Sequence, residues 1–176
     1  MTDRQSLRLG VAVITMGDRR ARLIKLLDSV KAQEGEPALT VVVGQGVPLP
    51  GLPDGVHAVE LPQNLGIPGG PKGCVAWLRD RGGVDVLVVL DDDGLPDPHA
   101  FEMLRQQFAL DPGLGIVSFR IVDEQGQSAR RHVPRLGGVH PERSRGGRRA
   151  PGLPSLRIPG LPTAGTTSSG WPNPRR

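Results

Sequence analysis

Short apolar runs alternate with amphipathic stretches along the first two thirds of the chain. Residues 9–15, 39–43 and 57–61 are rich in β-branched and other apolar side chains, which predicts three strands. A strand is also predicted at 84–90, where the five consecutive apolar residues 86–90 are typical of a strand buried on both faces. A further apolar run at 116–122 predicts another strand.

Helical periodicity separates these runs. Between Asp18 and Gly35, apolar residues recur on one helical face, at Leu23, Leu26, Leu27 and Val30. A second helix is expected to begin at Gly70, before a proline, and to end at Gly82. A third follows Asp97, which precedes another proline and for which we predict a helix-capping role. The alternation predicts an α/β domain with a mostly parallel sheet.

The pattern stops at residue 139 and divides the chain into a domain, 1–138, and a tail, 139–176. The tail holds 7 of the 18 prolines and 6 of the 25 glycines and shows no period, so we predict that it is disordered. Net charge changes at the same place, from −2 over the domain to +6 over the tail. A segment this rich in Arg, Gly and Pro is what a GC-rich coding sequence yields when read out of frame.

The composition limits which cellular compartment and which classes of partner are expected for the chain. Cys74 is the only cysteine, which excludes an internal disulfide and suits a reducing compartment. With no apolar run of membrane-spanning length and no signal peptide, we predict a cytoplasmic protein without a transmembrane segment, the inner face of the membrane being a second location. Trp171 is the only aromatic residue of the basic tail, so no specific nucleic-acid partner is expected.

Three carboxylates, Asp91, Asp92 and Asp93, directly follow the buried strand predicted at 84–90. Ligands of parallel α/β sheets bind at the carboxyl ends of strands, so this is a candidate site. Neighbouring carboxylates repel one another, and the binding of a divalent cation would explain why three of them occur together. Mg²⁺ or Mn²⁺ commonly binds one or two carboxylates together with substrate phosphates. The alternative is a solvated acidic turn.

A glycine-rich loop is predicted at residues 64–73, NLGIPGGPKG. Its four glycines leave backbone amides open to close approach, and it leads into a helix N-terminus, where an anionic phosphate is stabilised. Lys72 adds a positive charge there. The alternative is an ordinary connecting loop.

Together these segments resemble the nucleotide-sugar-binding half of family 2 glycosyltransferases, which have the GT-A fold. The strand at 9–15, the loop at 64–73 and VLVVLDDDGLPDP at 86–98 carry the resemblance, which covers about residues 8–138. It implies a Rossmann-like, mostly parallel sheet and inverting transfer of a sugar from a nucleoside-diphosphate-sugar donor. The acceptor, whether glycan, lipid or small molecule, is unknown, and the implied cofactor is Mg²⁺ or Mn²⁺.

The resemblance also implies roles for single residues. Asp91 and Asp93 correspond to the outer carboxylates of the family's DxD-type motif, with Asp93 a direct metal ligand and Asp91 nearer the ribose or the metal's water shell. Thr15 lies where the family contacts the nucleotide base. The family's Asn-x-Gly and Gly-Gly loop beside the nucleotide corresponds here to Asn64, Gly66 and Gly70, with Lys72 next to it.

The sequence departs from the family at three places. Residues 44–46 lack the acidic residue that many members use against the base, and Pro71 and Lys72 replace the usual small or amide residues. The family's second half, which supplies the acceptor site and the catalytic carboxylate, has no counterpart, since the only acid after residue 138 is Glu142. We therefore expect a chain truncated or frameshifted after about residue 138, without its catalytic base and impaired in transfer.

An alternative comes from the same acidic segment. A hydrophobic strand followed by residues 91–95, DDDGL, also matches the nucleophile motif of haloacid-dehalogenase-like phosphatases. In that family Asp91 would attack phosphorus and Asp93 would act as acid and base. The long α/β pattern before the motif and the lack of any lysine after Lys72 count against this reading.

Overall fold

The computed structural model describes residues 7–35, 37–81, 83–111, 113–127 and 154–157. Its elements along the chain are β1 (Leu9–Thr15), α1 (Arg20–Lys31), β2 (Leu39–Gln45), β3 (Val56–Leu61), α2 (Gly66–Arg81), β4 (Val86–Asp91), β5 (Leu95–Pro96), α3 (Ala100–Leu110), β6 (Arg120–Val122) and β7 (Ser155–Arg157). Within this part of the chain, no helix is both long and apolar enough to cross a membrane.

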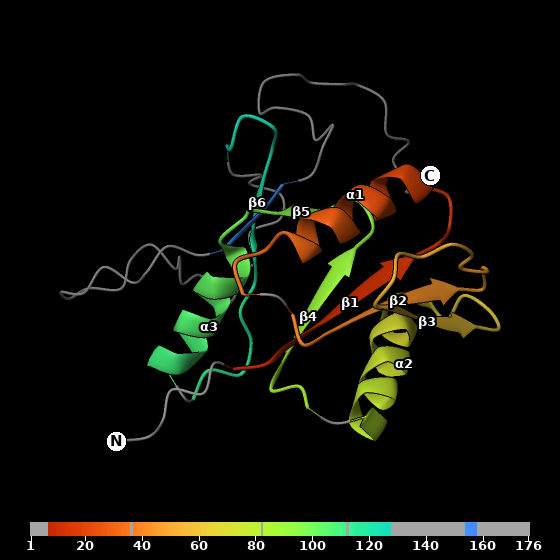
Figure 1. Cartoon of the computed structure of the whole chain (residues 1–176), viewed down its shortest axis with the longest axis horizontal. Coiled ribbons are helices and arrows are strands. Elements are labelled where there is room, and N and C mark those ends of the chain that lie inside the picture. The colour runs from red at the N-terminus through yellow and green to blue at the C-terminus, as the bar shows by residue number, and fades with distance from the viewer. Residues whose placement is uncertain (1–6, 36, 82, 112, 128–153, 158–176) are drawn as a thin grey trace, which may run out of the picture.

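The main sheet has the strand order β3-β2-β1-β4, and its three neighbouring pairs are all parallel. The chain adds β2 and β3 on one side of β1, then passes through α2 and places β4 on the other side of β1 (Figure 1). The predicted α/β architecture with a mostly parallel sheet is confirmed, and it is consistent with a Rossmann-like fold. The order reverses between β1 and β4, so these two strands flank the topological switch point.

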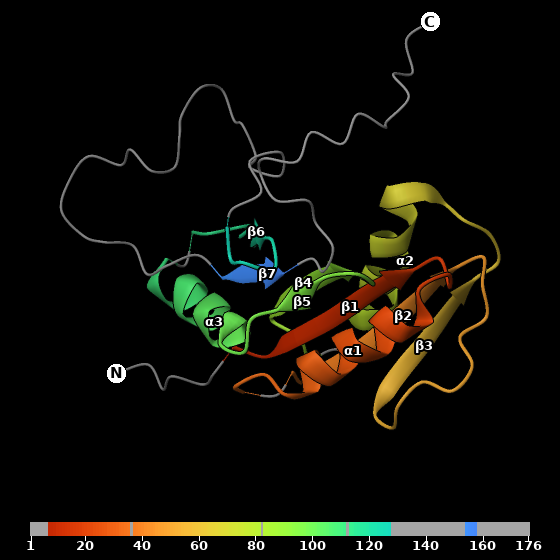
Figure 2. The ribbon, with the colours of Figure 1, turned by 90° about the horizontal axis from the view of Figure 1, so that it is seen from above.

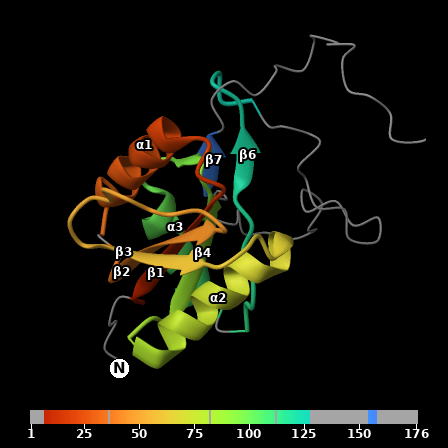
Figure 3. The same cartoon turned by 90° about the vertical axis from the view of Figure 1, so that its right-hand side faces the viewer.

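The helices cover the two faces of this sheet, α1 and α3 on one and α2 on the other (Figure 3). Alternation along β1 explains the division, because successive side chains of a strand point to opposite faces. Val11 and Val13 belong to the core formed with α1 and α3, whereas Ala12 belongs to the core formed with α2. The apolar face predicted for α1 is confirmed by its buried residues, Leu23, Leu26, Leu27 and Val30.

The glycine-rich segment is helical over most of its length. α2 begins at Gly66 and contains Pro71, so the prediction of a loop over 64–73 followed by a helix from Gly70 is wrong. The Gly66 N–H donates to Oδ1 of Asn64 at 2.8 Å, and the Leu65 N–H donates to Oε1 of Gln45 at 3.2 Å. These side chains satisfy amides that a helix start leaves without partners, and so the helix begins earlier than the sequence pattern indicates.

A second, three-stranded sheet has the order β5-β7-β6. β7 pairs antiparallel with β5 and parallel with β6, and it lies within the segment 139–176, where we expected no strand. That expectation is wrong for Ser155–Arg157, and apart from Pro154 the rest of the tail lies outside the described residues. Only Arg120–Val122 of the strand predicted at 116–122 forms, because β7 pairs with these residues alone.

Candidate functional site

The acidic segment lies at the switch point of the main sheet. Asp91 is the last residue of β4 and is in register with Ile14 of β1, one residue before Thr15 ends that strand. A turn follows, in which the Gly94 N–H donates to the carbonyl oxygen of Asp91 at 3.3 Å. The three carboxylates therefore stand at the sheet edge where parallel α/β folds place their ligands.

The middle carboxylate, Asp92, points inward. Only 4% of its surface is exposed, and its Oδ2 accepts a hydrogen bond of 2.5 Å from the hydroxyl of Thr15. The Thr15 oxygen in turn accepts the N–H of Gly17 at 3.0 Å. The family resemblance assigns Thr15 to the nucleotide base. In this structure the Thr15 hydroxyl instead donates a hydrogen bond to Asp92.

Arg19, which precedes α1, faces the acidic turn. Its Nη1 lies 2.6 Å from Oδ2 of Asp93 and 3.3 Å from Oδ1 of Asp92. The sequence pattern assigned no role to Arg19. One sequence feature could have indicated it: the residue follows the end of β1, and the carboxyl ends of neighbouring parallel strands meet at one sheet edge.

Asp91 is the most exposed of the three aspartates. Partial desolvation, followed by the charges of Asp93 and Asp92, raises the pKa of Asp91 above its ordinary value, while Arg19 acts in the opposite direction. A cation beside Asp91 would stabilise the charged form of this carboxylate and so offset the effects of desolvation and of the neighbouring aspartates.

A metal ion would find two carboxylates here and not three. Among the residues that the structure describes, no group of three or more His, Cys, Asp or Glu side chains is arranged to hold a metal. Asp92 is engaged by Thr15, which leaves Asp91 and Asp93. Hard carboxylate oxygens fit Mg²⁺ or Mn²⁺, which take their remaining ligands from water and substrate phosphates. Two protein carboxylates would therefore leave coordination positions on the ion for the oxygens of a bound ligand and of water.

The N-terminal end of α2 lies at the same sheet edge, near the end of β1. Nδ2 of Asn64 is 3.4 Å from the sulfur of Met16. A Cβ on Gly70 would lie 3.0 Å from the side chain of Ile14, so glycine permits this close approach of α2 to β1. Lys72 is exposed in the second turn of α2. No hydrogen bond or ion pair between described residues joins these α2 positions to the three aspartates.

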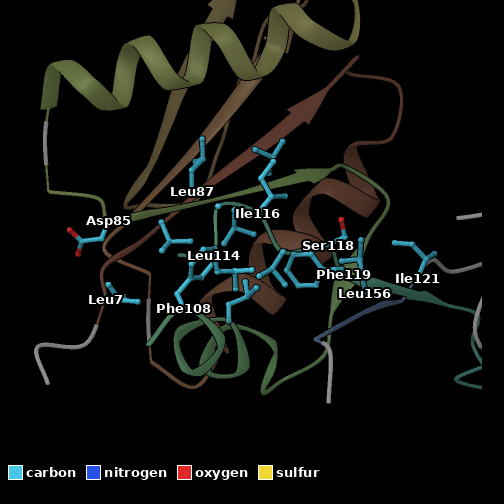
Figure 4. A pocket seen from close by; sticks show the side chains of 16 residues that line it. Leu7, Asp85, Leu87, Phe108, Leu114, Ile116, Ser118, Phe119, Ile121 and Leu156 are labelled. Carbon is cyan, nitrogen blue, oxygen red and sulfur yellow. The ribbon is translucent and has the colours of Figure 1, made fainter. Parts of the chain in front are cut away.

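A larger hollow lies elsewhere. A cavity of about 890 Å³ is bounded by β4, α3 and the residues from 114 to 121, and most of the side chains that line it are apolar (Figure 4). Its one carboxylate, Asp85, is paired with Arg8 at 3.1 Å. This cavity offers packing surface and no reactive group, so the chemistry of the molecule remains at the switch point.

Comparison with known proteins adds no family to these observations. No model of a protein family matches the chain, and no curated protein matches its sequence.

Proposed function

We propose that the chain binds a nucleoside-diphosphate sugar together with Mg²⁺ or Mn²⁺ at the carboxyl ends of β1 and β4, as the donor half of a family 2 glycosyltransferase of GT-A fold does. One observation carries the proposal: the Asp91–Asp92–Asp93 turn stands at the switch point of a parallel sheet, beside the end of β1. Ligands of such sheets bind at this position.

Each polar group at this edge has a role in the proposal. Asp93 and Asp91 hold the ion, and the Thr15–Asp92 hydrogen bond fixes the turn that presents them. The ion, when bound, supplies positive charge that neutralises the departing diphosphate. Arg19 is the counter-ion of Asp93 without ligand and competes with the metal for that carboxylate.

The N-terminal end of α2 supplies the second part of the donor site. A helix N-terminus favours negative charge, so the diphosphate is placed toward the first turn of α2, near Gly66 and Gly70, with Lys72 as an additional cation. The helix dipole acts there and not the Gly66 N–H, which already donates to Asn64. Asn64 keeps the first turn of α2 in place through its bond to the Gly66 N–H.

Transfer to an acceptor requires a base within reach of the acceptor hydroxyl. Two acids that follow the turn serve other bonds. Asp97 accepts a hydrogen bond from Ser155, and buried Asp123 accepts the amides of Gln125 and Gln127. We therefore propose donor binding with impaired transfer for this chain.

Titration calorimetry with Mn²⁺ and a panel of nucleoside diphosphates tests the proposal. We expect binding that requires the metal, is lost in Asp93→Asn, and is retained in Asp28→Asn, which removes an exposed carboxylate from α1. Equal binding by Asp93→Asn, or none by the unmodified chain, would contradict the proposal.

A second assay separates the phosphatase alternative. Release of phosphate from a phosphate monoester, dependent on Mg²⁺ and lost in Asp91→Asn, would favour that reading. We expect no such release, because the proposed function uses Asp91 as a ligand and not as a nucleophile.

A further inference from the structure

β7 is the middle strand of the second sheet and meets the chain directly after the acidic turn (Figure 2). Leu95 and Pro96, which form β5, are in register with Arg157 and Leu156. On its other side β7 pairs with β6. Three residues far along the sequence therefore join two segments that have no other strand partner among the described residues.

Leu156 packs against the last residue of the acidic turn. A Cβ on Gly94 would lie 2.8 Å from Cδ2 of Leu156, which is closer than side-chain carbons approach one another. Leu156 is only 9% exposed and belongs to the core shared with α1 and α3. Since Gly94 closes the turn by donating to Asp91, Leu156 fixes the position of that closing residue.

Polar contacts hold the segment after the turn as well. The Asp97 N–H donates to the carbonyl oxygen of Ser155 at 3.1 Å, and the Ser155 hydroxyl donates to the Asp97 carboxylate. Nη2 of Arg157 lies 3.6 Å from Oδ1 of Asp97. The capping role predicted for Asp97 is thus wrong: no side chain caps α3, and this carboxylate binds β7.

The two sides of the turn are therefore held by different parts of the chain. Thr15 and Arg19 hold Asp92 and Asp93 from the β1 side. β7 holds residues 94–97 from the other side through its pairing with β5, one apolar contact and three polar contacts. Gln33, which follows α1, adds a hydrogen bond from its Nε2 to the carbonyl oxygen of Asp97 at 2.8 Å. The orientation of Asp91 and Asp93 depends on both, because a short turn moves when either end is released.

We propose that Ser155–Arg157 positions the acidic turn for its ligand, with Leu156 as the principal positioning residue; the ligand, a nucleoside diphosphate with a divalent cation, rests on the function proposed above. Groups that orient metal ligands without touching the ion contribute to metal affinity because they remove the cost of ordering the ligands. Leu156 acts on the site through Gly94 in this way.

The test compares Leu156→Ala with Leu27→Ala in the full chain. Leu27 is buried in the same core but lies two turns into α1, away from the acidic turn. Two properties are measured: amide hydrogen exchange of residues 92–95 without ligand, and calorimetric affinity for Mn²⁺ with UDP and with GDP. Melting temperature is recorded for both variants, so that a general loss of stability is separated from a local effect.

We expect Leu156→Ala to speed exchange at residues 92–95 and to weaken binding by about 10- to 100-fold. Leu27→Ala should change neither property, even if its melting temperature falls as far as that of Leu156→Ala. Leu156→Met, which keeps an apolar side chain of similar volume, should show exchange and affinity close to those of the unmodified chain. Should Leu156→Ala fail to fold, Ser155→Ala, which removes one hydroxyl, is measured in its place.

Equal exchange and equal affinity in the two alanine variants would overturn the positioning role. If the unmodified chain binds no nucleotide with either probe, the proposed function fails, and the exchange data alone then decide whether β7 holds the turn. Unchanged exchange in Leu156→Ala would overturn the inference in that case.

Discussion

Nη1 of Arg19 lies 2.6 Å from Oδ2 of Asp93, so the residue that precedes α1 neutralises a carboxylate at the end of β4. The two residues are 74 positions apart in the sequence. The same guanidinium reaches buried Asp92. The acidic turn is thus partly neutralised within the protein, and any metal that binds there exchanges one positive charge for another.

Removal of this counter-ion should destabilise the fold. Arg19→Ala leaves buried Asp92 with Thr15 as its remaining side-chain partner, and we expect a loss of about 1–3 kcal/mol of unfolding free energy. Arg22→Ala, which removes an exposed arginine from the first turn of α1, should change stability by less than about 0.5 kcal/mol. Urea denaturation measures both.

Mn²⁺ provides a further check on Arg19. If the ion binds Asp91 and Asp93, its addition should raise the melting temperature of Arg19→Ala more than that of the unmodified chain, because no guanidinium competes for the carboxylate. Equal shifts in the two proteins would contradict competition at this site.

The Thr15 hydroxyl should be worth more than its size indicates. Thr15→Val keeps the shape of the side chain but removes the donor to a carboxylate that is almost fully buried, at a cost of about 1–3 kcal/mol. Thr40→Val in β2 is the matched control, since the hydroxyl of Thr40 makes no hydrogen bond within the described residues. Similar denaturation midpoints for the two variants would show that the Thr15–Asp92 bond contributes nothing to stability.

Asp91 should oppose folding at neutral pH. Its pKa is raised in the folded protein, so between its ordinary value and the raised value the native state binds more protons than the unfolded state. Stability is therefore lost as pH rises through that window. Asp91→Asn should melt at a higher temperature than the unmodified chain at pH 7, and the difference should vanish near pH 3. A lower melting temperature for Asp91→Asn at pH 7 would contradict this sign.

The tail should contribute to stability through β7. A chain shortened to residues 1–138 loses Leu156 from the core together with both strand pairings of β7, and we expect it to be less stable by about 2–5 kcal/mol. A chain that ends at residue 160 retains β7 and should melt close to the full chain. Thermal denaturation that places the two shortened chains together would contradict a structural role for this strand.

The local sequence pattern was sufficient to predict those elements whose burial follows from the spacing of their own apolar residues. β1 has the predicted bounds, because a short apolar run with strands on both sides is buried at every position except Ile14, which is half-buried. The apolar face of α1 follows from helical spacing in the same way. Three aspartates after an apolar strand indicated the candidate site before its surroundings were known, since a strand end in a parallel sheet lies at the ligand-binding edge.

The sequence by itself thus determined the α/β class, the presence of the strands and the position of the acidic turn along the chain. The burial predicted for the strand at 84–90 on both faces is wrong: β4 lies at the edge of the main sheet, and Val89 is 42% exposed. Only the tertiary structure decided which groups surround that turn. Thr15 and Asp92 are 77 residues apart, and their hydrogen bond exists because β4 pairs with β1 and not with β3. The strand at Ser155–Arg157 has no periodicity that distinguishes it from the rest of the tail, and its stability comes from partners on both sides. The spacing of apolar residues along an element shows which of its faces is apolar. Contacts between distant segments depend instead on which strands lie next to each other in the sheet.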